Sequence, residues 1–266
     1  MDYINYVKQS PFAGFTGFGG GATGLAFRSG ETSTNAGDYI TANLVRNYDA
    51  SDTTAGNSGS SFPDLSGNNA HMSHVGATFS SAAGSPNYGG AYTFDGTDDY
   101  MVFDTPSVET SAQTVEVWCN LVNGASAFGG FGYILHNNSA STNTGSSYMT
   151  FGTNGSDNQR LYAAYDGEYS SMTSTTSGSG IVHMVLTYNG SSNQKFYLNN
   201  SQIASVSTSG PQNFESETTV GGMDPPNQAY RPTQGQLFSL RWYNAELSSS
   251  DVASNWNNRK AWYGLS

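Results

Sequence analysis

The chain has 266 residues and is rich in glycine (32) and aromatic residues (13%), whereas charged residues make up only 11% and the net charge is −11. The aromatic content excludes a wholly disordered chain, because disordered segments lack the apolar side chains that offset the entropy of ordering. Nine Lys and Arg residues, with no basic cluster, exclude a nucleic-acid partner, which needs cations to neutralise its phosphates. A membrane span is not expected either, because no apolar run reaches about 18 residues.

Residues 1–37 are predicted to form an extended arm that attaches the protein to a larger assembly. The glycine-rich run 10–30 has no strong preference for helix or strand, and it carries four candidate anchors: Phe12, Phe15, Phe18 and Phe27. The first residues, MDYINYVKQSPF, lack the basic and apolar segments of a secretory signal. We therefore expect the chain to be made and folded in a cytoplasm.

Residues 38–266 are predicted to form one all-β domain, because short segments of alternating apolar and polar residues lie between spacers rich in Gly, Ser, Thr and Asn. In Thr114–Leu121, Val115, Val117 and Cys119 share one face, which indicates that this face is buried and that the single cysteine acts as a small hydrophobe. The predicted strands are Tyr39–Val45, Ala91–Phe94, Tyr100–Asp104, Thr114–Leu121, Tyr133–His136, Ser147–Phe151, Arg160–Tyr165, Ile181–Tyr188, Gln194–Leu198, Gln202–Val206, Thr218–Gly221 and Gln236–Tyr243.

One short helix is predicted after the last strand. Ser248 and Asp251 have the spacing of a capping box, in which the serine hydroxyl accepts a hydrogen bond from a free backbone N–H. Val252 and Trp256 lie one turn apart, so one face of this helix can pack against a sheet.

Three blocks of sequence stand out by their order and spacing. They are residues 62–69 (FPDLSGNN) with 94–100 (FDGTDDY); 114–118 (TVEVW) with 181–188 (IVHMVLTY) and 195–200 (KFYLNN); and 235–248 (GQLFSLRWYNAELS) with 250–257 (SDVASNWN) and 263–265 (YGL). Together they resemble the laminin-G-like branch of the concanavalin A-like lectin/glucanase superfamily. Two departures, Asn199-Asn200 in place of the usual Asn-Gly turn and Ile181 in place of a usual Trp, are compatible with the fold, because Asn tolerates positive φ.

The resemblance implies a jelly-roll sandwich of two antiparallel sheets, with an extended N-terminal arm and one short C-terminal helix. The third block is especially similar to laminin-G-like domains in structural proteins of tailed bacteriophages. This similarity implies a virion protein.

Enzymes of this superfamily carry two catalytic carboxylates on one strand, spaced Glu-x-Asp-x-x-Glu. The similar strand here has Glu116 but no acid two residues later. Asp98 and Asp99 would point to opposite faces of an extended strand. The sequence therefore predicts no enzymatic activity, and a degenerate β-glucanase that uses Glu116 is the alternative.

The histidines are assigned no catalytic role. His71 and His74 are interpreted as a solvated loop pair, because no cysteine or His-Glu-x-x-His context supports zinc binding. His183 alternates with apolar residues and is interpreted as a hydrogen-bonded strand histidine.

Calcium is the one cofactor that the resemblance suggests. Relatives often bind Ca²⁺ near the Asp-x-Ser-Gly and Phe-Asp-Gly blocks, and Asp-rich loops supply oxygen ligands. The candidate ligands are Asp64, Asp95, Asp98 and Asp99. The alternative is that Asp64 and Asp95 hydrogen-bond their own turns.

Glycan binding is the other property that the resemblance suggests. Aromatic side chains in or near loop-rich segments are candidates for stacking on sugars: Phe131, Tyr148, Tyr165 and Tyr169. The alternative is that such residues fill half-buried sheet positions.

The leading hypothesis is a non-enzymatic bacteriophage virion protein, most simply a capsid decoration protein. Its arm would bind other virion proteins such as the major capsid protein, and its weakly charged sandwich would project from the virion surface. A homo-oligomer is expected, because exposed sheet edges must be blunted or paired. The alternative function is a glycan-binding adhesion module, on a tail fibre or capsid, that contacts host polysaccharide.

Overall fold

The computed structural model describes residues 39–266 except 53–55, 59, 83–88, 108–110, 123–131, 138–148, 155–159, 166–171, 178, 209–213, 215 and 223–231. The chain divides into two units, Met1–Thr32 and Ser33–Ser266, and all described residues belong to the second. The predicted arm and its four phenylalanines therefore lie outside the described residues. Among the residues that are described, no helix has the length and hydropathy needed to cross a bilayer.

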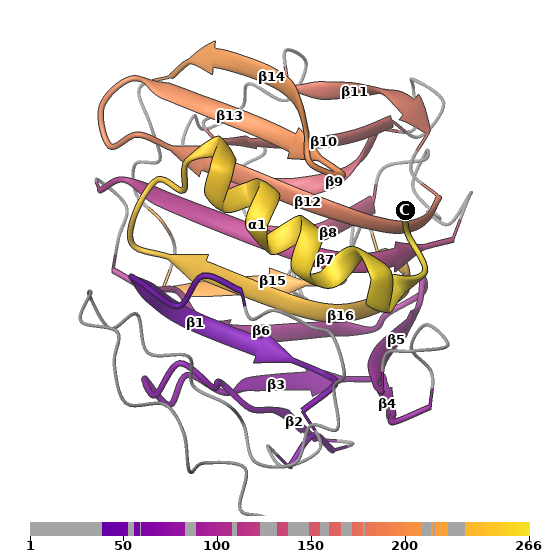
Figure 1. Cartoon of the computed structure of the whole chain (residues 1–266). Coiled ribbons are helices and arrows are strands. Elements are labelled where there is room, and N and C mark those ends of the chain that lie inside the picture. Colours follow the sequence, from indigo (N-terminus) through magenta and orange to yellow (C-terminus); the bar gives the residue numbers. More distant parts are fainter. Residues whose placement is uncertain are drawn as a thin grey trace, which may run out of the picture. The chain divides into compact units, whose positions relative to one another are not determined.

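Two antiparallel sheets pack face to face and form a sandwich, which confirms the predicted fold class (Figure 1). Sheet A has the order β14-β13-β12-β7-β16-β5-β4, and β1 pairs with the second half of β16. Its strands are β1 (Leu44–Asp49), β4 (Thr78–Ser80), β5 (Ala91–Asp95), β7 (Gln113–Leu121), β12 (Gly180–Tyr188), β13 (Asn193–Leu198), β14 (Ser201–Ser207) and β16 (Gln234–Tyr243).

Sheet B has the order β11-β10-β9-β8-β15-β6-β3-β2. All of its pairs are antiparallel, as in sheet A. Its strands are β2 (Ser61–Phe62), β3 (Met72–Val75), β6 (Tyr100–Asp104), β8 (Gly132–Asn137), β9 (Met149–Asn154), β10 (Arg160–Tyr165), β11 (Thr173–Ser177) and β15 (Glu217–Val220).

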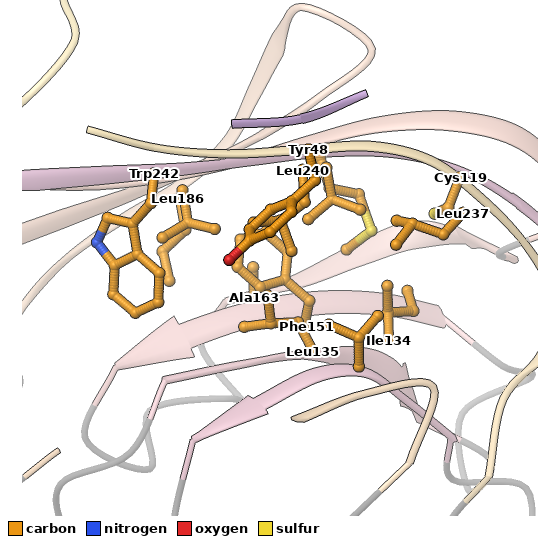
Figure 2. Close-up of a cluster of buried hydrophobic side chains, with 14 of the residues drawn as sticks. Tyr48, Cys119, Ile134, Leu135, Phe151, Ala163, Leu186, Leu237, Leu240 and Trp242 are labelled. Atoms are coloured by element: carbon orange, nitrogen blue, oxygen red, sulfur yellow. The ribbon is translucent and has the colours of Figure 1, made fainter. Parts of the chain in front are cut away.

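The core lies between the sheets and is built from alternate residues of the long strands. Val115, Val117 and Cys119 of β7 point into it, as the period-two pattern predicts. Figure 2 shows side chains of the two sheets meeting there, with Leu186 of sheet A and Phe151 of sheet B among them. Each fully buried side chain of this kind stabilises the fold by roughly 1.5–3 kcal/mol. Burial also raises the pKa of the Cys119 thiol to about 12, which fits the predicted role of a small hydrophobe.

Helix α1 (Ser249–Arg259) covers the outer face of sheet A and crosses β12, β7 and β16 (Figure 1). The predicted capping box is present: Ser248 Oγ accepts from the Asp251 N–H at 3.2 Å, and Asp251 Oδ2 accepts from the Ser248 N–H at 3.0 Å. Val252 and Trp256 are buried against the sheet. A 3-10 helix, Lys260–Tyr263, follows α1 directly.

The tight turn between β13 and β14 also follows the prediction. Asn199 and Asn200 have φ values of 49° and 67°, the left-handed conformation that a type I′ hairpin turn requires at both central positions. The departure from Asn-Gly therefore leaves the hairpin intact.

Some predicted boundaries are wrong. A strand over Tyr39–Val45 was expected, but β1 begins at Leu44, because Asn43 has a φ of 60° and interrupts the extended backbone. The strand expected over Ser147–Phe151 is instead β9, Met149–Asn154. The sequence patterns also missed β2, β3, β4 and β11, which are short and mostly polar.

Candidate functional site

Glu116 lies in β7, on the strand that resembles the catalytic strand of the glucanases, but it faces the underside of α1 and is only 1% exposed. Its Oε1 accepts from Trp118 Nε1 at 3.1 Å and lies 2.9 Å from His183 Nε2. Its Oε2 accepts from Asn255 Nδ2 at 2.7 Å and from the Tyr243 hydroxyl at 3.3 Å. Both carboxylate oxygens therefore contact buried protein groups beneath α1.

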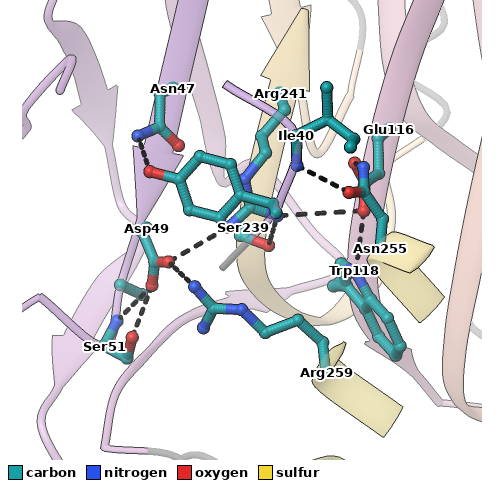
Figure 3. Close-up of polar contacts among 12 residues, drawn as sticks. Ile40, Asn47, Asp49, Ser51, Glu116, Trp118, Ser239, Arg241, Asn255 and Arg259 are labelled. Atoms are coloured by element: carbon teal, nitrogen blue, oxygen red, sulfur yellow. Dashed lines mark hydrogen bonds and ion pairs between the residues drawn. The ribbon is translucent and has the colours of Figure 1, made fainter. Parts of the chain in front are cut away.

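A second buried carboxylate, Asp49 of β1, joins the same network (Figure 3). Its Oδ2 accepts from Arg241 Nη2 at 3.1 Å and from Arg259 Nη2 at 3.2 Å. Arg241 Nη1 also lies 3.8 Å from Glu116 Oε1. Two carboxylates thus face two guanidinium groups in a buried site, with His183 beside Glu116. We call Asp49, Glu116, Arg241 and Arg259 the buried charge network.

The network determines the protonation of Glu116. Burial by itself would raise the pKa of this carboxyl, but the hydrogen bond and charge of His183, together with the charge of Arg241, outweigh burial and hold the pKa at about 2. Asp49 and Glu116 in turn raise the pKa of Arg241 far above its usual range, against the opposing effect of burial. Glu116 is therefore an ionised structural carboxylate.

The first described residues are attached to this network. The Tyr39 ring lies 3.8 Å from the guanidinium carbon of Arg241, and the Tyr39 hydroxyl accepts from Asn47 Nδ2 at 2.7 Å. The Ile40 N–H donates to Asn255 Oδ1 on α1 at 2.8 Å. The segment that follows the predicted arm is thus held between the helix and β1.

The histidines have local hydrogen-bond roles. His183 is buried, stacks on Trp118 with ring centroids 4.3 Å apart and contacts Glu116, as expected of a hydrogen-bonded strand histidine. His71 Nδ1 accepts from the Asp64 N–H at 3.0 Å, and His74 Nε2 lies 3.2 Å from the Ser58 carbonyl oxygen.

Three of the four aspartates proposed as calcium ligands converge. One carboxylate oxygen each of Asp95, Asp98 and Asp99, in the turn between β5 and β6, lies within 4.8 Å of the other two. The chain turns here instead of staying extended, so Asp98 and Asp99 do not point apart. Asp64 lies outside this group, and its carboxylate accepts from three backbone N–H groups, those of Asn47, Ser66 and Ala70. Asp64 therefore hydrogen-bonds its own turn and β1. Asp95 also accepts from its own turn, at 2.7 Å from the Thr97 N–H, so the alternative that the sequence left open is present for both residues.

We call residues 95–99 the acidic turn. The surrounding backbone holds the Asp99 carboxylate in place within it. Asp99 is 8% exposed, and its Oδ2 accepts from the Asp95 N–H at 2.7 Å. Gly76 makes room for it, because a Cβ at Gly76 would lie 1.9 Å from Asp99 Oδ1. Burial and the charges of Asp95 and Asp98 raise the pKa of Asp99, although the backbone hydrogen bond opposes them. A divalent cation would relieve this repulsion, and three carboxylates fit the oxygen preference of Ca²⁺.

The acidic turn leads directly into an exposed surface on sheet B. Met101 and Phe103 of β6 are buried in the core, so the alternate residues of β6 face outward. The register places Val75 opposite Tyr100 and Glu217 opposite Asp104. Val75 is 54% exposed. We call the β6 face the set of outward residues Ser73, Val75, Tyr100, Val102, Asp104 and Glu217.

Two carboxylates of the β6 face are neighbours on adjacent strands. Asp104 and Glu217 are both exposed and stand directly opposite each other on antiparallel strands. Like charges in this position destabilise a sheet by a few tenths of a kcal/mol, up to about 1 kcal/mol.

The predicted glycan-stacking residues are not among those that define the β6 face. Phe131, Tyr148 and Tyr169 fall outside the described residues, and Tyr165 belongs to β10, although the position of its side chain is not described. Those four stay predictions. The sequence reasoning missed Tyr100, although the alternation in Tyr100–Asp104, with Met101 and Phe103 on the more apolar side, indicates that Tyr100 faces outward.

Residues 95–253 match the concanavalin A-like lectin/glucanases superfamily, and the chain belongs to it. A comparison with curated protein sequences gave no match. This match does not address the expected association with tailed phages, which stays a prediction.

Solved structures share the fold at low sequence identity. The binding domain of Paraclostridial Mosquitocidal Protein 1 has 15% identity and a TM-score of 0.58, over 84% of this chain and 55% of that one. Trypanosoma rangeli sialidase in complex with sialic acid has 15% identity and a TM-score of 0.58, over 80% and 32%. The binding domain of Botulinum Neurotoxin DC in complex with SialylT has 11% identity and a TM-score of 0.57, over 82% and 52%. The chain thus spans about half, or less, of each of these proteins.

Glu116→Gln is predicted to lower the free energy of unfolding by about 3 kcal/mol, because it leaves the buried guanidinium of Arg241 with one anionic partner fewer. Urea melts followed by tryptophan fluorescence measure the loss. The matched control is Glu246→Gln, which breaks a half-exposed ion pair with Lys195 and should cost less than about 1 kcal/mol. An unchanged stability, together with β-glucan hydrolysis that Glu116→Gln abolishes, would restore Glu116 as a catalytic acid.

Acid is predicted to destabilise the protein through Glu116. The pKa of this carboxyl falls from 4.5 to about 2 on folding, so its stabilising effect is complete above pH 4.5 and is lost as the pH falls towards 2. Urea melts of the wild type and Glu116→Gln across this interval give the comparison. The wild type should lose more stability than the variant, and parallel pH curves would contradict the low pKa.

Proposed function

We propose that the sandwich is a non-enzymatic carbohydrate-binding module whose ligand lies along the β6 face and the adjoining acidic turn. The observation that carries the proposal is the difference between the two sheets. Helix α1 covers the outer face of sheet A, whereas β6 presents Tyr100 between the acidic turn and the opposed carboxylates of Asp104 and Glu217. Membership of a superfamily that includes lectins supports it.

The residues of the β6 face have the chemistry that sugars require. The ring of Tyr100 offers an aromatic surface with a polar end. The carboxylates of Asp104 and Glu217 are acceptors only, and each can take several hydrogen bonds from hydroxyl groups. A row of one aromatic ring, two valines and two acceptors along β3, β6 and β15 suits a chain of sugar units that is both stacked and hydrogen-bonded.

The negative charge of the β6 face favours neutral glycans over acidic glycans as ligands. The net charge is −11, and the carboxylates of Asp104 and Glu217 are exposed on this face. An acidic sugar brings a further negative charge to this surface, whereas neutral hydroxyl groups meet acceptors. Structural neighbours include a sialidase in complex with sialic acid and a toxin binding domain in complex with SialylT. For this chain we infer that sialylated glycans bind only where a cation offsets the charge.

We propose that Asp95, Asp98 and Asp99 hold that cation, with Ca²⁺ as the best fit to three carboxylates. A bound calcium ion would supply positive charge and open coordination positions for sugar hydroxyls. The chain's own residues set the site: Gly76 lets Asp99 approach, and the Asp95 N–H orients the Asp99 carboxylate.

A virion decoration role, on a particle surface after synthesis in a host cytoplasm, is a second proposal. The observation that favours it is the attachment of Tyr39 and Ile40 to the buried charge network and to α1. An arm that binds a particle would therefore be joined firmly to the sandwich. This role is compatible with glycan binding, because a displayed lectin domain can do both.

The full chain is predicted to bind neutral glycans on an array, and Tyr100→Ala should lower the affinity at least tenfold because it removes the stacking surface. Tyr100→Phe keeps the ring and should retain most of the affinity. Trp262→Ala, which removes a partly exposed aromatic residue next to Arg259, is the control for an aromatic lost elsewhere. Binding that Tyr100→Ala leaves unchanged would place the ligand on another surface, and the absence of any hit would overturn the proposal.

Calcium is predicted to bind the acidic turn and to raise the melting temperature of protein that has first been treated with a chelator. Isothermal titration with CaCl₂ measures the affinity, and Asp98→Asn should weaken it. Asp104→Asn is the matched control, because Asp104 is an exposed aspartate at the other end of β6. No heat and no rise in melting temperature would end the calcium hypothesis.

A further inference from the structure

We propose that two copies of this chain associate through β14, edge to edge, in an antiparallel pair that continues sheet A from one copy into the other. The strand that pairs with the free edge of β14 is thus the β14 of a second copy. This inference stands on the strand topology and does not depend on the proposed function.

The edges of the two sheets differ in length. On one flank of the sandwich sheet A ends at β4, with three residues, and sheet B ends at β2, with two. Edges that short cannot pair extensively with another chain. On the other flank sheet A ends at β14, with seven residues, and sheet B at β11, with five. Sheet A has a further edge at β1, with six residues, but the carbonyl groups of Val45 and Asn47 there already accept hydrogen bonds from residues 65–68. Among the described strands, β14 is therefore the longest edge left for pairing.

The long edge lacks the usual devices that prevent pairing. The sequences of β14 and β11, SQIASVS and TSTTS, contain no charged residue and no proline. Natural edge strands commonly carry lysine or proline at such positions. In a chain with a net charge of −11, an uncharged contact strand favours association with an identical copy, and the described residues of β14 and β11 carry no charge.

Backbone groups on the free edge of β14 are available for pairing. Thr208 donates its N–H to the Ser192 carbonyl on the β13 side, and antiparallel strands alternate, so the N–H and C=O groups of Ser205 and Ser207 point away from β13. Among the described residues no strand pairs with this edge. The register is regular from Ala204 to Ser207. In a symmetric pair centred on Ser205, Ala204 of one copy lies opposite Val206 of the other.

An exposed apolar side chain lies beside this segment. The register shift between Phe196 and Tyr197 leaves Ile203 as an extra residue on β14, and Ile203 is 36% exposed. In an antiparallel pair centred on Ser205, Ile203 of one copy lies next to Ser207 of the other. The pair would therefore bury this side chain together with the backbone hydrogen bonds.

The geometry of such a dimer has a functional consequence. The two-fold axis that relates antiparallel strands in one continuous sheet is perpendicular to that sheet, so both copies turn their sheet B towards the same side. Both β6 faces would then point towards one surface. Two binding sites on one side give avidity for a surface that carries many glycans. Only this last step rests on the proposed function.

The test is sedimentation velocity of the full chain over a range of concentrations. The expected species is a dimer with twice the 28.2 kDa mass of the chain. Ser205→Pro removes an N–H that β13 does not use, so the monomer should fold while the dimer weakens at least tenfold. Ile203→Lys replaces the exposed apolar side chain beside the pair with a charge of the kind that edge strands use against pairing, and it should have the same effect. Ser80→Lys, on the opposite edge of sheet A, is the control that should leave the dimer unchanged.

A wild-type chain that stays monomeric throughout, or a dimer that survives both β14 variants with unaltered affinity, would overturn the proposal. Far-ultraviolet circular dichroism and melting temperatures of the two variants separate loss of the dimer from loss of the fold. The sedimentation result is independent of any glycan, so a failure of the glycan proposal leaves this test intact.

Discussion

The buried charge network beneath α1 is the constraint on which the rest of the structure depends. Asp49 and Glu116 are removed from water, and a buried carboxylate is tolerated only when cations and hydrogen-bond donors surround it. Arg241 reaches both from β16, and Arg259 reaches Asp49 from the helix. The network therefore fixes α1 on sheet A, and the position of α1 covers the face that Glu116 occupies.

This arrangement makes the outer faces of the two sheets different. The outer face of sheet A contributes to stability, because α1 packs on it and the segment at Tyr39 is attached there. Sheet B keeps an exposed strip along β6, where like-charged Asp104 and Glu217 are tolerated at a cost to stability. The strand position that resembles the catalytic one of the glucanases is thus buried in the charge network beneath α1, and the surface that we propose for glycan binding lies on the opposite sheet.

Local patterns in the sequence predict local features of the fold well. The alternation around Cys119, the capping box at Ser248 and the Asn199-Asn200 turn each depend on residues close in the chain. The buried charge network could not be predicted in this way, because its partners lie far apart: Glu116 and His183 are 67 residues apart, and Asp49 and Arg259 are 210. The sequence named Asp95, Asp98 and Asp99 together as candidate calcium ligands, whereas the bend that brings Asp98 and Asp99 to one side could not be predicted from local alternation.

The claim that recognition lies on sheet B while Glu116 serves the fold is tested most directly by mapping amide chemical-shift changes of the full chain as a bound glycan is titrated in. The account predicts that the largest changes fall on Ser73, Tyr100 and Val102 and on the acidic turn, while α1 and β7 remain unchanged. Changes concentrated on α1 around Asn255, or along β7 at Glu116, would contradict it.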